Sequence, residues 1–385
     1  MEAYLDNSAT TRVSDGVKDI VVKVMTEDYG NPSSLHMKGV EAERYIKEAK
    51  DNIAKVMKVE PKEIIFTSGG TESNNMALNG CAMANRSAGY HNITSAIELA
   101  SIHATAKFLQ ENGFRITYLP VDNEGHVSLE ALKEALCDET ILVSVMHVNN
   151  EIGAIEPVGE ISEIVKAYNP KILFHVDAIQ SFGKLMVQPK KIGADLVSVS
   201  GHKIHGPKGS GFLYVSDKVK IKPVIYGGGQ QKGMRSGTEY VPAIAGIGLA
   251  VKEAYSDFDN KIKHMTELKD YFIDRVTSID NVTVNSAKGE NGAPHIISVS
   301  FNGVRSEVML HSLEEKHIYI SSGSACSSNK PAVSATLKSI GLPDEQIDST
   351  VRFSLCYETT KEELDYAVDT VASQIELLRK FTRRK

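Results

Sequence analysis

Glycines and hydroxyls gather in the segment Thr67–Asn75, which runs Thr-Ser-Gly-Gly-Thr-Glu-Ser-Asn-Asn between a predicted strand and a predicted helix. Gly69 and Gly70 allow the backbone to approach a ligand closely, and hydroxyls at a helix N-terminus suit a phosphate group. An ordinary Ser or Thr N-cap would have the same residue types, so this segment alone leaves both interpretations open. The pattern is not GxGxxG and lacks the lysine of a P-loop, which argues against a dinucleotide or a nucleoside triphosphate.

A carboxylate lies at the end of the apolar run 172–176, where Asp177 follows directly and Gln180 comes three residues later. A carboxylate at the end of a buried strand is costly unless a cation meets it. The protonated ring nitrogen of pyridoxal phosphate (PLP) is such a cation, and the cofactor needs that proton to act as an electron sink. Asp177 could instead cap the next helix, and its own sequence context does not exclude this.

A lysine follows the next apolar strand, Leu196–Ser200, where the chain continues through Gly and His to Lys203. Desolvation can remove the proton of a lysine, which then becomes a nucleophilic amine toward carbonyl groups. Ser200 and His202 place a hydroxyl and an imidazole beside it, within reach of a phosphate. A single lysine after a strand is usually a solvated loop residue. Three strand ends that each offer a complementary group for one cofactor predict a PLP site instead.

A fourth predicted strand, 141–147, leads to two adjacent amides and an acid, Asn149, Asn150 and Glu151. These side chains could serve either a turn or the phenolic oxygen of the cofactor. The sequence alone does not decide between the two roles.

Cys326 lies in the small, polar run 321–329, Ser-Ser-Gly-Ser-Ala-Cys-Ser-Ser-Asn. A core cysteine has large apolar neighbours and Cys326 has none, which favours a nucleophilic role over a packing role. Cys81 lies in an apolar helix and is expected in the core, whereas Cys137 and Cys356 have no partner that the sequence identifies. The 4 cysteines form no CxxC pair and no Cys/His metal spacing, so we expect free thiols in a reducing cytoplasm and no metal site.

The elements that must position these residues alternate between short β-branched runs and amphipathic helices from about residue 60 to 215. This alternation predicts an α/β fold with a mostly parallel, doubly wound sheet, in which ligands bind beyond the carboxyl ends of the strands. The predicted strands are 64–67, 92–95, 115–119, 141–147, 172–177, 196–200 and 211–215. The predicted helices between them include 99–110, 129–136 and 158–168.

The character of the chain changes near residue 256, which predicts a second domain. Its expected elements are a long charged helix, two short strands and a closing amphipathic helix, at 258–278, 282–284, 296–301 and 361–380. We therefore predict a large PLP-binding domain at 1–255 and a smaller α+β domain at 256–385, which carries the Cys326 loop. Residues 1–14 are expected to pack with the smaller domain.

The bulk composition fits a two-domain globular protein. The chain has 385 residues, of which 42% are hydrophobic and 24% charged. The net charge of −6 gives no reason to expect direct binding to nucleic acid or to a membrane. The start, MEAYLDNSATT, does not look like a signal peptide, and no apolar run approaches the roughly 20 residues that span a bilayer.

The motifs together resemble those of a known enzyme family. YLDNSATT, GNPSSLH, TSGGTESNN, NNEIG, HVDAIQS, SGHKIHGPKG, GGGQQKGMRSGTE and SGSACSS occur in this order over nearly the whole chain. The set is similar to that of cysteine desulfurases of the iron–sulfur cluster assembly type, which are class V aminotransferases. The resemblance implies the fold of fold-type I PLP enzymes, with a seven-stranded sheet and a smaller C-terminal domain.

The resemblance also implies how the cofactor is bound. Lys203 would bind PLP covalently, and Asp177 would meet the ring nitrogen. Gln180 and Asn150 would lie at the phenolic oxygen of the ring and its surroundings. The remaining implied contacts, to the phosphate, come from Gly70, Thr71, Ser200 and His202.

The resemblance implies the substrate, the assembly and the reaction as well. Arg352 would grip the carboxylate of L-cysteine, a bidentate contact suited to a guanidinium, with Asn150 beside the substrate. Thr238 would reach the phosphate of a second subunit, which implies a homodimer. Cys326 would take the sulfur as a persulfide and pass it to a sulfur-acceptor protein, for iron–sulfur clusters or tRNA thiolation, while the substrate becomes L-alanine.

One residue departs from the family pattern: Leu99 follows Glu98, where these enzymes carry a histidine that stacks on the cofactor ring. A leucine can cover the ring but cannot move a proton, and general acid–base help is worth roughly 10²–10⁴-fold. His103, His36 and Lys203 are the other candidate proton carriers. The departure leaves open a selenocysteine lyase, a C–S β-lyase or another class V aminotransferase on the same scaffold, and a weakly active sulfur-relay platform.

Overall fold

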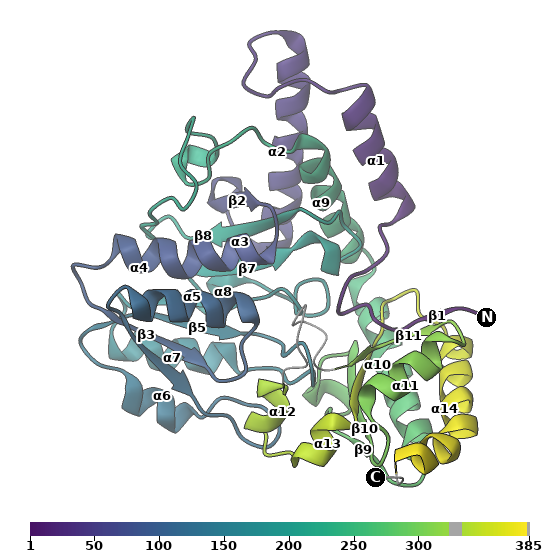
Figure 1. Ribbon diagram of the computed structural model, residues 1–385. Helices are drawn as coiled ribbons and strands as arrows, with labels where there is room; N and C mark the ends of the chain where they lie inside the picture. Colours follow the sequence, from purple (N-terminus) through teal and green to yellow (C-terminus); the bar gives the residue numbers. More distant parts are fainter. Residues whose placement is uncertain (323–332, 383–385) are drawn as a thin grey trace.

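A seven-stranded sheet forms the centre of the computed structural model, which describes residues 1–322 and 333–382 (Figure 1). The strand order is β2-β8-β7-β6-β5-β3-β4, and every neighbouring pair is parallel except the two that involve β8. The strands are β2 (Ile64–Thr67), β3 (His91–Ser95), β4 (Arg115–Leu119), β5 (Thr140–Met146), β6 (Leu173–Asp177), β7 (Leu196–Ser200) and β8 (Gly211–Val215). The prediction of a mostly parallel α/β sheet is confirmed.

Apolar side chains alternate along the strands and build a separate core on each face of this sheet. In β2, for example, Ile64 and Phe66 belong to one core and Ile65 belongs to the other. The first core is closed by α2 (Met37–Met57), α6 (Leu129–Ala135), α7 (Val158–Tyr168) and α9 (Val241–Ala254). The second is closed by a π-helix (Met76–Gly80), α4 (Cys81–Ala84) and α5 (Ala100–Glu111). The sheet is therefore doubly wound.

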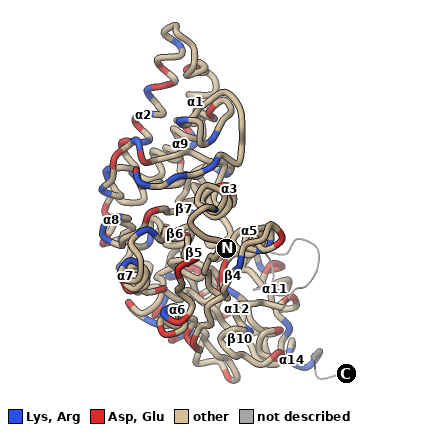
Figure 2. The backbone as a smooth tube through the Cα atoms, turned by 90° about the vertical axis from the view of Figure 1, so that its left-hand side faces the viewer, with Lys and Arg blue, Asp and Glu red and all other residues tan. Residues whose placement is uncertain are grey.

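The helices α1 (Asp15–Thr26) and α2 form a pair that packs on α9. Ser14 caps α1 by accepting a hydrogen bond from the backbone N–H of Val17 at 3.2 Å. The connection between α1 and α2 projects away from the sheet in two perpendicular views (Figures 1 and 2). Figure 2 also shows basic and acidic residues interleaved along α2 and α7, as a net charge of only −6 allows.

A smaller antiparallel sheet lies beside the large one, with strand order β12-β13-β10-β9. Its core joins apolar residues of the strands with those of the surrounding helices and includes Phe272, Phe301 and Phe353. The strands are β9 (Val282–Val284), β10 (Ile296–Phe301), β12 (Ser321–Ser322) and β13 (Thr350–Ser354). The helices are α10 (Phe258–Val276), α11 (Ser306–Glu314), α12 (Ala335–Ser339), α13 (Asp344–Asp348) and α14 (Lys361–Thr382).

The N-terminal segment crosses to this smaller sheet. The strand β1 (Ala3–Tyr4) pairs in parallel with β11 (Ile318–Tyr319), and Asp6 forms a bridge with Ser354. The division of the chain into domains at residue 255 stays a prediction. Within the described ranges, no helix combines the length and the apolar character that crossing a membrane requires.

Candidate active site

The carboxyl ends of β6 and β7 bring a buried carboxylate next to a lysine. Asp177 is the last residue of β6 and pairs in register with Ser198 of β7, while Lys203 lies in the 3-10 turn Gly201–Lys203 that follows β7. Asp177 is only 2% exposed, and burial raises the pKa of its carboxyl to about 6. Its oxygens accept hydrogen bonds from the N–H of Ile179 at 2.9 Å and from Nδ2 of Asn74 at 2.8 Å.

Burial raises the pKa of the Asp177 carboxyl, and the hydrogen bonds and the nearby charge of Lys203 oppose this effect. A buried carboxylate is unfavourable unless a cation meets it. A protonated ring nitrogen of the size and charge of a pyridinium would complete its environment.

The N-terminal segment meets the lysine and the predicted cofactor residue Gln180. Nζ of Lys203 donates to the carbonyl oxygens of Ser8 at 2.5 Å and of Ala9 at 2.7 Å, and Nε2 of Gln180 donates to the oxygen of Ser8 at 3.0 Å. The N–H of Thr11 donates to the carbonyl of residue 202 at 2.9 Å and holds the segment on the turn. Residues 8–11 therefore form one wall of the site.

The start of α3 (Gly70–Asn75) presents its backbone to Ser200. Gly69, at φ +149°, and Gly70 leave a cradle that side chains would fill, because a Cβ at Gly70 would lie 2.2 Å from Cδ1 of Ile179. A Cβ at Gly69 would lie 3.8 Å from the hydroxyl of Ser200. Exposed backbone N–H groups at a helix start and a buried hydroxyl are the donors that a phosphate takes.

The other predicted phosphate contacts lie around this cradle. Thr71 is exposed in the first turn of α3, and His202 is half-buried, with its Nδ1 3.2 Å from the hydroxyl of Thr10. Burial and the charges of three nearby lysines lower the pKa of His202 to about 4, so the imidazole is neutral at neutral pH. The donor set as a whole fits PLP: a buried carboxylate, an amine beside it, and a glycine-lined helix start with a hydroxyl.

Arg352 lies on β13 and is held by two oxygens. Its Nη1 donates to the carbonyl of Asn150 at 2.8 Å, and its Nη2 donates to Oδ1 of Asp6 at 2.9 Å. Its Nε is buried and has no hydrogen-bond partner in the described part of the chain. A guanidinium N–H without an acceptor is a donor that a carboxylate could take. The backbone of Asn150, rather than its amide, makes the contact that joins these two predicted site residues.

The sequence did not predict the contacts made by Asn74, Asp6 and His295. Asn74 was a detectable signal, since it lies in the same TSGGTESNN motif as Gly70. Asp6 and His295 reach the site only through the fold. Nε2 of His295 lies 3.4 Å from Oε1 of Gln180, and because the amide nitrogen of Gln180 already donates to Ser8, His295 must carry its proton on Nε2.

Leu99 is the N-cap residue of α5, and this helix start lies close to Asp177. Ser101 accepts a hydrogen bond at 2.9 Å from the same Asn74 amide that donates to Asp177. His103, one turn further on, stacks on Tyr118 with ring centroids 5.6 Å apart, and burial lowers its pKa. His103 therefore packs against Tyr118 of the edge strand β4.

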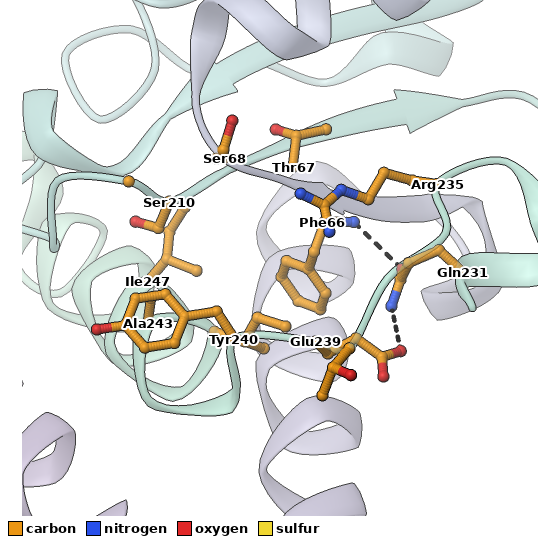
Figure 3. Close-up of a pocket in the computed structure, with 14 residues that line it drawn as sticks. Phe66, Thr67, Ser68, Ser210, Gln231, Arg235, Glu239, Tyr240, Ala243 and Ile247 are labelled. Atoms are coloured by element: carbon orange, nitrogen blue, oxygen red, sulfur yellow. Dashed lines mark hydrogen bonds between the residues drawn. The ribbon is translucent and has the colours of Figure 1, made fainter. Parts of the chain in front are cut away.

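Thr238 lies in a different environment from the other predicted site residues. It is exposed and lines a pocket of about 210 Å³ together with Thr67, Ser68 and Arg235, but it has no hydrogen bond to Ser200 or His202 of its own chain. Figure 3 shows Arg235 and Gln231 on the side of this pocket opposite Ser210 and Ile247.

Cys326, the predicted nucleophile, lies outside the described residues. The three described cysteines, Cys81, Cys137 and Cys356, are free thiols. Cys81 is buried in the second core, as predicted. Cys137 accepts a hydrogen bond from Nη2 of Arg115 at 2.9 Å, and Cys356 is buried in the loop after β13.

Comparisons with known proteins identify the family of the chain. Residues 3–367 match the family model described as aminotransferase class-V. The chain is 45% identical over 379 residues to the cysteine desulfurase IscS of Dictyoglomus turgidum, covering 98% of this chain and 95% of that protein. It is also 41% identical over 376 residues to the cysteine desulfurase IscS of Methanosarcina thermophila, covering 98% of this chain and 92% of that protein.

Solved structures give the same result. A NifS-like protein superposes with a TM-score of 0.93 at 37% identity, covering 98% of this chain and 100% of that one. The structure described as SspA in complex with cysteine superposes with a TM-score of 0.82 at 34% identity, covering 93% of this chain and 100% of that one.

Proposed function

The chain belongs to the class-V aminotransferase family, in its cysteine desulfurase branch, and we propose that it is a PLP-dependent enzyme that converts L-cysteine to L-alanine. The observation that carries this proposal is the meeting of three groups at one sheet edge. These are the buried carboxylate of Asp177, the amine of Lys203 and the glycine-lined start of α3. The relatives named as cysteine desulfurases support the choice of substrate.

The residues at this edge would hold the cofactor as follows. Asp177 would face the ring nitrogen, Gln180 would donate to the phenolic oxygen with its second amide hydrogen, and Lys203 would bond covalently to the carbonyl carbon. The phosphate would take backbone donors from Gly70 and Thr71 together with Ser200 and His202. When bound, PLP supplies an electron sink for the electron pair released at the α-carbon of the substrate.

The substrate carboxylate would be held by Arg352, whose Nε is a buried open donor. Asp6 and the carbonyl of Asn150 fix the guanidinium plane, so the open N–H keeps one direction. Lys203 would accept the α-proton of the bound substrate, because its amine lies at the same edge of the sheet as Asp177. Asn150 would line the substrate side of the same pocket.

Cys326 would receive the sulfur. Its thiolate would bond to the sulfur of the substrate while the bond between that sulfur and the β-carbon breaks, and the electron pair of the broken bond stays with the carbon and is later protonated. One cysteine and one thiolate thus give one alanine and one persulfide, with no external oxidant or reductant. The persulfide would then pass to a thiol of an acceptor protein that serves iron–sulfur clusters or tRNA thiolation.

The enzyme would work as a homodimer in the cytoplasm. Thr238 is exposed and has no hydrogen bond to Ser200 or His202 in its own chain, which suits a residue that completes the phosphate site of a partner. Large apolar side chains are exposed on the projecting α1–α2 connection, among them Tyr29 and Leu35, and on Met37 at the start of α2. The free thiols at Cys81, Cys137 and Cys356 support a reducing compartment.

The proposal is tested by product analysis of the wild type and two cysteine variants. With L-cysteine and a reductant, the wild type is expected to release alanine and sulfide in equal amounts. Cys326→Ala should keep the visible absorbance of lysine-bound PLP and lose persulfide formation, while Cys137→Ala, the matched control, should retain both. Lys203→Ala should lose the absorbance of the covalently bound cofactor.

Three outcomes would contradict the proposal. Pyruvate and ammonia in place of alanine would indicate a β-lyase, and activity restricted to selenocysteine would indicate a selenocysteine lyase. Alanine and sulfide release at the wild-type rate by Cys326→Ala would remove Cys326 as the sulfur acceptor.

A further inference from the structure

Lys184 is a buried lysine directly behind the active-site lysine. Its side chain is 7% exposed, and Nζ donates a hydrogen bond to the backbone carbonyl of Lys203. Within the described ranges, no carboxylate lies within ion-pair distance of Lys184. A buried ammonium without an acidic partner is unfavourable, so its presence beside Lys203 calls for a compensating role.

The groups that face Lys184 have opposite effects on its charge. Burial, the largest effect, and the charge of Lys203 lower the pKa of Lys184 to about 8, whereas Cys356, from the loop after β13, raises that pKa. The charge of Lys184 in turn lowers the pKa values of three histidines around the site, which are His202, His205 and His295. Lys184 is therefore a cation at neutral pH whose field extends through this side of the site.

The charged groups that interact with Lys203 have opposite effects on the protonation of its amine. Among the described residues, Asp177 is the acid that interacts with Lys203, and it favours the charged amine. Lys184 is a like charge and favours the uncharged amine. His202 and His295 also interact with Lys203, but both have lowered pKa values and are neutral near pH 7. Asp177 and Lys184 are thus two charged groups with opposite effects on the Lys203 amine, which also donates hydrogen bonds to the carbonyls of Ser8 and Ala9.

We propose that Lys184 is a positioning residue for Lys203 that anchors its backbone carbonyl and, through its positive charge, favours the uncharged, nucleophilic form of the Lys203 amine. A lysine near another cation is a known way to obtain a reactive amine at neutral pH. The inference rests on the proposed PLP chemistry, because it assigns Lys184 a purpose only where Lys203 must form a covalent bond. The two effects of Lys184, the hydrogen bond and the charge, can be separated by substitution.

The test compares Lys184→Met, Lys184→Gln and Lys184→Arg in the holoenzyme. The readout is the pH midpoint of the absorbance change of PLP bound to Lys203. Loss of a nearby positive charge stabilises the protonated nitrogen, so Met and Gln should raise this midpoint by about one pH unit, and Arg should leave it near the wild-type value. Gln keeps a hydrogen-bond donor, so a midpoint unchanged in Gln but raised in Met would assign the effect to the hydrogen bond and overturn the electrostatic part.

Lys269→Met is the matched control. Lys269 is likewise buried and donates to a backbone carbonyl, that of Ala293 at 2.8 Å, but it lies on α10, which packs beside β10. The Lys269→Met variant should leave the pH midpoint of the PLP absorbance change unchanged if the effect is specific to Lys184. An unchanged midpoint in folded Met and Gln variants of Lys184, checked by circular dichroism, would overturn the proposal.

A second measurement separates this inference from the proposed function. The pH dependence of labelling of Lys203 by an amine-directed reagent, followed by mass spectrometry in the full chain without added PLP, reports the amine itself. Lys184→Met should shift this dependence to higher pH by a similar amount. If the labelling shifts but the wild type does not bind PLP, the proposed function is contradicted and the coupling between the two lysines stands. If the wild type binds PLP but neither the labelling nor the absorbance midpoint shifts, only the coupling is contradicted.

Discussion

Leu99 is the residue at which the proposed chemistry lacks a proton carrier. It precedes α5, whose first turn is linked to Asp177 through Ser101 and Asn74. The imidazole of His103 is stacked on Tyr118 and its pKa is lowered by burial, so this side chain is engaged in packing. We therefore expect Lys203 to serve in more than one proton transfer.

Leu99→His should therefore increase the rate of alanine formation, by roughly 10²-fold where proton transfer limits turnover. Leu99→Phe is the matched control, because a phenyl ring stacks on a cofactor but does not carry a proton. Steady-state alanine production at saturating cysteine is the measurement. An equal gain in both variants would assign the deficit to stacking, and no gain in either would show that Lys203 or another group already carries the proton.

For single residues, the sequence predicted the site residues that follow strands. It did not predict the residues that the fold brings to the site from distant parts of the chain. Asp177 and Lys203 end neighbouring strands, so the rule that parallel strand ends share an edge brings them together. Asp6 and Lys184 contact Arg352 and Lys203 only because the N-terminal segment and the turn after β6 fold over the site. No local pattern in the sequence encodes those contacts.

The helix α3 shows how an element sets the shape of the site. Its first residue, Gly70, lies where a side chain would meet Ile179, whose N–H donates to Asp177. The side chain of Ile179 thus packs on the backbone at the start of α3, while its N–H binds the carboxylate at the end of β6. A change in volume at Gly70 should disturb both the phosphate site and the carboxylate.

Gly70→Ala is expected to weaken PLP binding by about tenfold or more, because Ile179 or the helix must move to admit the methyl group. The dissociation constant can be measured by titrating the cofactor-free protein with PLP and following absorbance. Gly159→Ala is the matched control, since a Cβ at Gly159 in α7 meets nothing within 4 Å. The control should keep wild-type affinity and gain stability of about 0.5–1 kcal/mol. Equal affinity in the two variants would remove the steric role of Gly70.

Elements were predictable where they are long or strongly patterned. The seven strands of the large sheet agree with the predicted limits to within one residue, because most are short runs rich in β-branched and other apolar residues. The two-residue strands β1 and β11 were not predicted, since their pairing joins residues 3–4 to 318–319 and depends on tertiary structure. The π-helix Met76–Gly80 was also not predicted, because its sequence matches an ordinary apolar helix.

On the scale of the whole molecule, the α1–α2 connection is the feature that a single chain does not explain. It projects from the rest of the protein and exposes several large apolar side chains (Figure 1). The fully exposed residue among them is Leu35, with a relative exposure of 102%. We expect a second copy of the chain to cover this surface in the proposed homodimer, in which Thr238 would serve the partner.

Two negative charges introduced at Leu35 and Met37 should therefore dissociate the proposed dimer. Leu35→Glu combined with Met37→Glu is expected to give a monomer by light scattering at micromolar concentration, because buried unpaired carboxylates oppose association. Leu377→Glu is the matched control, since Leu377 is also exposed, at 57%, but lies on α14 in the smaller part of the molecule. If Thr238 acts across the interface, the monomer should also bind PLP more weakly than the control. A monomeric wild type would refute the shared site, and a monomeric variant with unchanged PLP affinity would show that Thr238 is not needed for the phosphate.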